Sequence, residues 1–500
     1  MFPFESQLSQ HGAQDLSALL QAEGILLDPK EPTTYERLRA DVVRIAADMD
    51  DETRNPPMYW TGIPFPRAVT NASCGPSLII SVGGTRTTYA LMRMAEGVPY
   101  IFDRQGREVK EERLAAVKED LSMPTPTPAD TKDGFEMITN IVGGMADYLT
   151  AARDSAQRCE AVLLSWGFAQ EVIRSGSDVL SGISARATRM QKDQAKFSRE
   201  LDGQDLGALF AESIEQHFGI RQAVTVANDT IMALHYFLTP EVLQTRPQVG
   251  LFVNGTGSNF AIAESYSVRP EGVVSRSDEA YQPARLTRKR SLLSGESEQR
   301  YFVNYEAGSI PLEATRCVLD QDTEYPLEEN ALAGGKAFRR QFREIFTRWI
   351  DADLYERLCA EREAAPGGPE VSELVAQGPS AANVVFPGHR FDAATTEKIF
   401  VAAHATVQRS ALHAALLLSA VSERIGFGLG HAGRGPDVLA MEGSVWRTPS
   451  YQRLVKEYWH DLLQPRGLRV RLTHEASYNA SLLGPLYLAA AQRAQQRNDS

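Results

Sequence analysis

The sequence predicts an α/β protein, because helix-like and strand-like segments alternate along the whole chain. Two segments, 33–49 and 134–153, carry apolar residues at the spacing of an amphipathic helix. Apolar runs of strand length occupy 78–82 and 160–168. Residues 397–425 are apolar over a much greater length and predict one or two long helices.

The composition is that of an ordinary globular protein. The 500 residues are enough for two or three domains at ~150 residues each. A net charge of −12 disfavours a large nucleic-acid surface, which needs a basic stripe. We expect the one basic run, 285–290, to be a solvated loop, with a phosphate or partner contact as the alternative.

Cysteine usage and the lack of long apolar stretches predict a cytoplasmic protein. The cysteines are far apart and form no CxxC pair, so we expect reduced thiols at Cys74, Cys159, Cys317 and Cys359. The N-terminal segment 1–12 has neither the basic nor the apolar region of a secretory signal. No stretch reaches ~18 consecutive apolar residues, so we expect no membrane span.

Two glycine- and threonine-containing hairpins echo each other in the two halves of the chain. Each of the segments 78–92 and 249–265 reads as an apolar strand, a tight Gly/Thr turn and a second strand. The turns begin at Gly83 and Gly255. Either one alone is typical of an ordinary hairpin. As a pair they favour a phosphate site, because backbone N–H groups and threonine hydroxyls can line it.

An aspartate follows a β-branched run at the start of a helical pattern. The segment 221–238 contains Asn228, Asp229 and Thr230 at this junction. A carboxylate at a strand end can accept a proton from a hydroxyl that attacks a phosphoryl group. The alternative is that Asp229 only caps the helix.

Three other site types have no support in the sequence. It contains no GxxxxGK[ST], no HExxH and no paired CxxC, so a P-loop or a zinc site is not predicted. The segment 428–433 matches GxGxxG but follows a helical segment, 411–425, instead of a strand. We therefore interpret it as a helix-ending loop.

Six motifs together resemble the hexokinase family in their order and spacing. They are SVGGTRTT (81–88), ANDTIMAL (227–234), NGTGSNFAIAE (254–264), NYEAG (304–308), EENALAGG (328–335) and MEGSVWR (441–447). The resemblance covers roughly residues 75–490. It implies two α/β lobes of the actin-like ATPase type (a duplicated ribonuclease H-like fold), with a sugar in the central cleft and ATP mostly on the larger lobe.

The same resemblance implies a domain organisation. Residues 1–74 would be a helical extension and connector. The small lobe would span 75–227 and be completed by a C-terminal helix at about 480–496. The large lobe would span 228–479.

The resemblance also implies which residues hold the sugar. Asp229 matches the general base that activates the sugar hydroxyl, and Arg189 stands where it could stabilise charge on the transferring phosphoryl group. The positions that match sugar contacts are Ser165, Thr188, Asn228, Asn259, Glu306 and Glu329. Acids and amides suit a polyol, because their oxygens accept hydrogen bonds from hydroxyls. Without the family context, Ser165, Glu306 and Glu329 would be read as exposed or capping residues.

A second set of positions matches the nucleotide site. These residues would contact the phosphates or the nucleotide: Gly83, Gly84, Thr85, Arg86, Gly255, Thr256, Gly257, Gly443, Ser444 and Ser477. The cofactors implied are ATP and Mg²⁺. No residue of the chain is predicted as a direct metal ligand.

The sequence departs from the family pattern mainly on the nucleotide side. Ser81 replaces an acid that helps to position Mg²⁺ through water, and Glu442 replaces an aspartate before Gly443. Tyr478 and Ala480 fill two positions of a glycine-rich turn. The Ser-Phe-Pro strand of the family reads Ser165-Trp166-Gly167 here, and Arg86-Thr87-Thr88 replaces Asn-x-Arg. The sugar half of the site is therefore better kept than the nucleotide half.

The leading functional hypothesis is an ATP- and Mg²⁺-dependent hexose kinase. One alternative is a weakened homologue that binds sugar and acts as a sensor or regulator, for which Ser81, Tyr478 and Ala480 are the reasons. Another is a kinase with an unusual acceptor or donor, suggested by Trp166-Gly167 and Tyr478. The expected partners are a small-molecule hexose and ATP, with no nucleic acid and no membrane.

Overall fold

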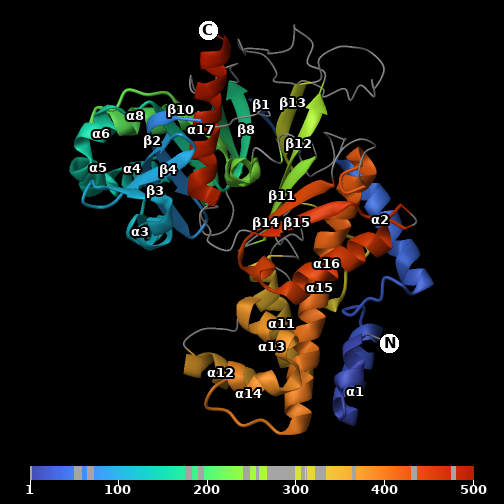
Figure 1. Cartoon of the computed structure of the whole chain (residues 1–500). Coiled ribbons are helices and arrows are strands. Elements are labelled where there is room, and N and C mark those ends of the chain that lie inside the picture. The colour runs from blue at the N-terminus through green and yellow to red at the C-terminus, as the bar shows by residue number, and fades with distance from the viewer. Residues whose placement is uncertain are drawn as a thin grey trace, which may run out of the picture. The chain divides into compact units, whose positions relative to one another are not determined.

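The computed structural model divides the chain into two compact units (Figure 1). Unit 1 comprises Met1–Pro57, Phe252–Asn259 and Glu306–Ala476, and unit 2 comprises Met58–Leu251, Phe260–Tyr305 and Ser477–Ser500. The structure describes residues 3–49, 59–64, 72–174, 183–189, 196–239, 242, 248–254, 258–266, 299–305, 310, 312–320, 334–362, 368–429, 436–464, 466–474 and 480–499. Within these ranges, no helix combines the length and apolar character that a membrane crossing requires.

Within the described ranges, the strands form two large sheets and one small one. The first large sheet has the order β1(Tyr59–Pro64)-β13(Gln299–Asn304)-β12(Ser258–Tyr266)-β11(Val249–Asn254)-β14(Asp437–Glu442)-β15(Val470–His474). The second has the order β10(Val224–Asn228)-β7(Ala161–Trp166)-β2(Cys74–Val82)-β3(Arg86–Ala95)-β4(Val98–Phe102)-β5(Glu108–Lys110), and β6(Ser122–Pro124) also pairs with β3. The small sheet pairs β8(Ala169–Arg174) with β9(Ser184–Arg189).

The centre of the second sheet is parallel and buried. Strands β2, β7 and β10 run parallel, and every residue of β7 and β10 is buried. Continuous apolar runs such as these are typical of parallel strands that are covered on both faces. The hairpin from β2 to β3 is antiparallel, with Ser81 opposite Thr88 and Val82 opposite Thr87. The carboxyl ends of β2, β7 and β10 therefore lie together at one edge of this sheet.

Helices pack around this sheet within unit 2 (Figure 1). They are α3(Leu114–Asp120), α4(Gly134–Gly143), α5(Ala146–Ala151), α6(Arg153–Gln157), α7(Ser198–Leu201), α8(Leu206–Phe218), α9(Asp229–Leu234) and the C-terminal α17(Ala480–Asp499). The continuous helix expected over 134–153 is instead broken, because α4 ends at Gly143 and Gly144 caps it. Glycine is a poor helix former, so two in succession favour this break.

The C-terminal helix α17 packs closely on α9, the helix that begins at Asp229. A Cβ atom on Gly484 would lie 1.9 Å from the carbonyl oxygen of Met232, so only glycine allows this approach. Tyr487 adds an edge-to-face contact with Tyr236, at 6.0 Å between ring centroids. The last residues of the chain thus complete the unit that holds Asp229.

Unit 1 is organised around one long buried helix, α15(Ala393–Ile425). The structure has one helix where the sequence allowed one or two. The other α-helices that the structure describes in this unit are α1(His11–Ala22), α2(Pro32–Asp48), α11(Gly335–Trp349), α12(Ala352–Arg362), α13(Gly368–Gln377), α14(Ala382–Val385) and α16(Pro449–Leu462). Helices α1, α2, α11, α13 and α16 pack against α15. A helix that is apolar on all sides must be covered in this way.

Buried charges tie other segments to α15. Arg409 of α15 forms an ion pair with Asp320, and only 3% and 8% of the two residues are exposed. Arg409 also donates to the carbonyl oxygen of Thr315 at 3.1 Å. Nearer its start, Glu397 accepts hydrogen bonds from the backbone N–H groups of Ser9 and Gln10. The segment that contains Ser9 and Gln10 is therefore fixed to α15 by specific polar contacts.

We expect Asp320→Ala to destabilise unit 1 by about 3–5 kcal/mol, because it leaves the Arg409 guanidinium buried without its carboxylate. The free energy of unfolding in urea measures this loss. Glu457→Ala is the control, since it removes the partner of Arg453 in an exposed pair at 3.7 Å and should cost less than about 1 kcal/mol. Equal losses in the two variants would contradict a special role for the buried pair.

Candidate functional site

The predicted site residues of unit 2 meet where three parallel strands end. Ser165 of β7 lies opposite Ser81 of β2 on one side and Ala227 of β10 on the other. One residue further along the strands, Trp166 lies opposite Val82 on one side and Asn228 on the other. The residues that follow each strand are Gly83, Gly167 and Asp229. In α/β sheets, ligands bind beyond the carboxyl ends of parallel strands, so this edge is the candidate site.

Asn228, and not Asp229, caps helix α9. The side-chain oxygen of Asn228 accepts a hydrogen bond from the Thr230 backbone N–H at 2.9 Å. Its Nδ2 donates to the carbonyl oxygen of Trp166 at 3.4 Å, which ties β10 to β7. The alternative interpretation of Asp229 as the helix cap is therefore wrong. The sugar contact expected for Asn228 stays a prediction, and its side chain is buried.

Asp229 is the first residue of α9 and is half-buried. Its Oδ1 accepts a hydrogen bond from the Thr230 hydroxyl at 3.2 Å. Its Oδ2 lies 3.0 Å from the position that a Cβ atom on Gly167 would occupy. Gly167 in turn has Gly83 of the first Gly/Thr turn beside it, at 3.3 Å from the same position. The carboxylate thus lies at the strand ends, close to the turn expected to hold phosphate.

Ser165 lies beside this group with its hydroxyl buried. None of the residues that the structure describes makes a hydrogen bond to its Oγ. A buried hydroxyl without a partner costs free energy, so a ligand hydroxyl here would be stabilising. The adjacent Trp166 is a packing residue, because its ring contacts Phe168 and Phe210 with centroids 5.3 and 6.1 Å apart.

The first Gly/Thr turn is held by a threonine from the proline-rich segment. The turn closes with a hydrogen bond from the Gly83 N–H to the Arg86 carbonyl oxygen at 3.0 Å. The Thr125 hydroxyl donates to the Gly83 carbonyl oxygen at 2.7 Å, and its N–H donates to the Thr85 carbonyl oxygen at 3.2 Å. Thr125 directly follows β6, and no motif in the sequence pointed to this role.

The outer residues of this turn face solvent. Thr85 and Arg86 are exposed, whereas Gly84 is buried. Arg86 pairs with Glu119 at 2.6 Å, and both side chains are largely exposed. The contacts with ATP phosphates expected for Gly83, Gly84, Thr85 and Arg86 stay predictions. Because an exposed ion pair is weak, it does not prevent Arg86 from changing partner.

The flanks of the second Gly/Thr turn are joined by a buried polar network in unit 1. The side chain of Asn254 donates to the Tyr451 hydroxyl at 2.8 Å and accepts from the Ser258 hydroxyl at 3.0 Å. The Ser410 hydroxyl also lies 3.2 Å from that of Tyr451. Burial raises the pKa of Tyr451, which keeps its hydroxyl protonated. The only signal in the sequence was a polar residue, Asn254, at the end of an apolar strand.

Several predicted residues lie outside the described residues or are described only in part. Outside them are Gly255, Thr256, Gly257, Glu306, Glu329 and Ser477, and also Tyr478. Thr188 and Arg189 end strand β9, and Ser444 begins a 3₁₀ turn, but their side chains are not described. Asn259 is half-buried in β12, and Gly443 follows β14 with a φ of 110° that favours glycine. The roles expected for these residues stay predictions.

The donor set at the strand ends is poor in metal ligands. It consists of the Ser81 and Ser165 hydroxyls and the Asp229 carboxylate. Among the described residues, no three His, Cys, Asp or Glu side chains are grouped to hold a metal ion. Mg²⁺ in phosphoryl-transfer sites is held by one or two carboxylates together with substrate phosphates and water. The described residues at these strand ends could supply one carboxylate to an Mg²⁺ ion, and its other ligands would have to come from elsewhere, such as nucleotide phosphates and water.

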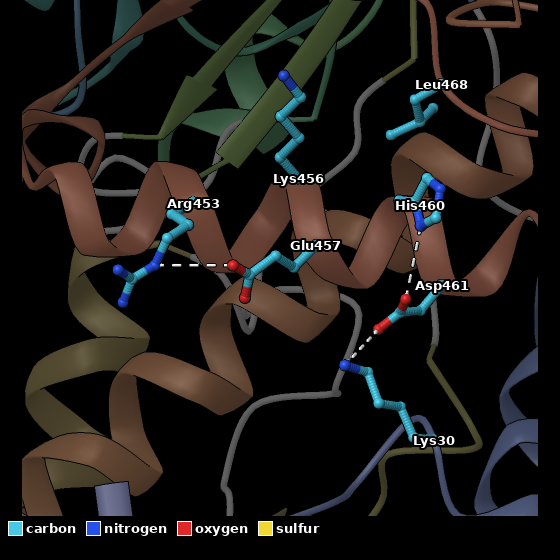
Figure 2. Close-up of a pocket in the computed structure, with 7 residues that line it drawn as sticks. All are labelled: Lys30, Arg453, Lys456, Glu457, His460, Asp461 and Leu468. Atoms are coloured by element: carbon cyan, nitrogen blue, oxygen red, sulfur yellow. Dashed lines mark ion pairs between the residues drawn. The ribbon is translucent and has the colours of Figure 1, made fainter. Parts of the chain in front are cut away.

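A separate shallow pocket of about 370 Å³ lies in unit 1 beside α16 (Figure 2). It is lined by Lys30, Arg453, Lys456, Glu457, His460, Asp461 and Leu468. Asp461 lies 3.8 Å from Lys30 and 3.6 Å from His460, and Arg453 pairs with Glu457 (Figure 2). Its positive and negative groups largely offset each other. The pocket shares no residue with the strand-end site, and we assign it no role.

Comparison with known proteins identifies the fold through solved structures. No protein-family model matches the sequence, and no curated protein matches it. A hexokinase from Schistosoma mansoni in complex with glucose is 18% identical, with a TM-score of 0.63 over 96% of this chain and 99% of that one. Another hexokinase structure is 15% identical, with a TM-score of 0.64 over 96% of this chain and 100% of that one.

The chain therefore has the α/β fold of hexokinases, the two-lobed actin-like ATPase type, as the six motifs implied. The match extends over nearly the whole of both chains. The match concerns the fold, since identity at this level does not transfer an activity.

A buried histidine follows the helix that begins at Asp229. His235 lies in the 3₁₀ turn His235–Phe237, with its ring 4.6 Å from that of Phe302. Its Nδ1–H donates to the Ile231 carbonyl oxygen at 2.9 Å. Burial removes water from the ring and lowers the pKa of His235 to about 4, although the hydrogen bond to the Ile231 carbonyl opposes this shift. The folded protein therefore holds this ring neutral.

We predict that His235→Gln flattens the acid dependence of stability. The pKa of His235 is about 4 when folded and about 6.5 when unfolded, so the unfolded chain binds the proton first. The contribution of His235 to the free energy of unfolding is therefore fully present above pH 6.5, and it is lost as the pH falls towards 4. Between pH 7.5 and 4.5 the variant should lose about 2–3 kcal/mol less than the wild type. Parallel pH curves of the unfolding free energy would contradict this.

Proposed function

We propose that this protein is a sugar kinase that transfers the γ-phosphate of ATP to a hydroxyl of a hexose. The observation that carries the proposal is the position of Asp229 at the joint end of three parallel strands, beside the Gly83 turn and Ser165. The hexokinase fold supports this assignment, and one of the similar structures is a complex with glucose.

In the proposed reaction, Asp229 is the general base. Its carboxylate accepts the proton of the attacking sugar hydroxyl, while that oxygen forms a bond to the γ-phosphorus and the bond to the leaving ADP breaks. Ser165 would hold a second sugar hydroxyl through its buried Oγ. The backbone N–H groups of the Gly83 turn would bind phosphate oxygens.

A bound Mg²⁺ ion would neutralise charge on the phosphates, and its position would depend on the nucleotide and water more than on this chain. Ser81 offers only a hydroxyl at the strand end, where the family pattern has an acid. Arg189, at the end of β9, is proposed to balance charge on the transferring group. The expected cytoplasmic location stays a prediction.

A sugar-binding regulator is the second candidate function. The single carboxylate described at the strand ends favours it. With one carboxylate the protein would bind Mg²⁺ weakly, which would lower the rate of phosphoryl transfer more than the affinity for sugar. In that case the protein would bind a hexose and bind ATP poorly. Measurements of affinity for the two ligands therefore separate the candidates.

The decisive experiment measures ADP release from Mg-ATP with a panel of hexoses. We expect sugar-dependent release that falls at least ~100-fold in Asp229→Asn, because the amide cannot take the proton. Asp120→Asn is the control, since Asp120 is an exposed aspartate at the end of α3 in the same unit. It should keep wild-type activity.

Two outcomes would overturn the kinase proposal. One is release that is unchanged in Asp229→Asn. The other is no release with any hexose although a hexose raises the melting temperature, which would favour the regulator. Titration calorimetry with glucose and with an ATP analogue would then show whether only the sugar is bound.

A further inference from the structure

Gly167 occupies the most crowded point of the strand-end site. It follows β7, and its N–H donates to the Val82 carbonyl oxygen at 2.8 Å, which extends the pairing of β7 with β2 by one residue. A Cβ atom on Gly167 would lie 2.9 Å from that same carbonyl oxygen and 3.0 Å from Oδ2 of Asp229. Real Cβ atoms are almost always farther from their neighbours, so any side chain would move one of these groups.

The groups that crowd Gly167 differ in how easily they can move. Two of the neighbouring atoms, the Val82 oxygen and the Gly83 Cα at 3.3 Å, belong to the backbone of the β2 strand end and cannot rotate away. The third belongs to the Asp229 carboxylate, which can rotate. A side chain at position 167 would therefore both strain the strand end and displace the carboxylate, which is the more mobile of the two.

We propose that Gly167 is a positioning residue for Asp229: the missing side chain allows the carboxylate to lie against the end of β7, next to the Gly83 turn. This inference rests on the proposed function, in which Asp229 takes the proton of the attacking hydroxyl. A general base must lie within hydrogen-bond reach of that proton, so a small displacement lowers the rate more than it lowers binding.

The contact can be tested without any activity. Gly167→Ala, Asp229→Ala and the double variant are unfolded in urea, and the midpoints are compared. We expect Gly167→Ala to lower the midpoint clearly less in the Asp229→Ala background than in the wild type, because the carboxylate that it would meet is gone. Part of the loss should remain, since the Val82 oxygen is still there.

A matched control is available in helix α8 of the same unit. A Cβ atom on Gly207 would lie 3.2 Å from the Val224 carbonyl oxygen, 3.3 Å from Oδ1 of Asp205 and 2.6 Å from the Ser184 hydroxyl oxygen. This surrounding resembles that of Gly167 in chemistry. Gly207→Ala should lower the midpoint by the same amount with and without Asp229→Ala.

Kinetics test the catalytic part. We expect Gly167→Ala to lower kcat between about 10-fold and 100-fold, with the KM for ATP changed less than about 3-fold. Gly207→Ala should leave kcat unchanged while lowering stability. If the role of Gly167 were purely structural, the apparent kcat of Gly167→Ala and Gly207→Ala would fall alike, each in proportion to its folded fraction.

The outcomes separate this inference from the function on which it rests. Additive midpoint shifts for Gly167→Ala and Asp229→Ala would overturn the contact itself. Coupled shifts with an unchanged kcat would overturn the positioning role. A wild-type protein without sugar-dependent ADP release would overturn the proposed function and the catalytic part together, while the midpoint comparison would still decide the contact.

Discussion

The parallel pairing of β2, β7 and β10 is the constraint on which the candidate site depends. A parallel register fixes which residues end each strand at the same level, and here it aligns Val82, Trp166 and Asn228. Shifting one strand by a single residue would turn its side chains to the opposite face of the sheet. The hydrogen bonds of the sheet therefore bring Gly83, Gly167 and Asp229 together.

Much of this arrangement could be predicted from local patterns. The apolar runs predicted the central strands, and the junction of a β-branched run with a helical pattern placed Asp229 at a strand end. The capping residue could not be assigned, because asparagine and aspartate cap helices equally well and both stand at the junction. The break between α4 and α5 was missed because the apolar spacing continues across Gly143 and Gly144.

Other features depend on neighbours that are remote along the chain. The need for glycine at position 167 becomes visible only when the Val82 carbonyl and the Asp229 carboxylate are both in place. The role of Thr125 likewise depends on a remote neighbour, because its hydroxyl donates to the Gly83 carbonyl oxygen. Tyr451 reaches Asn254 from α16, a helix that is remote from Asn254 in the sequence. A pattern search over one segment contains none of this information.

The docking of α17 on α9 has a consequence for the order of folding. Unit 2 begins near residue 58 but also contains Ser477–Ser500, so its parts are separated by most of the chain. Contacts between segments that are remote in the sequence form late, because a long loop must close before they are made. The surface of α9 that receives Gly484 is therefore covered only at a late step, and the helix that begins at Asp229 depends on a distant part of the chain for its packing.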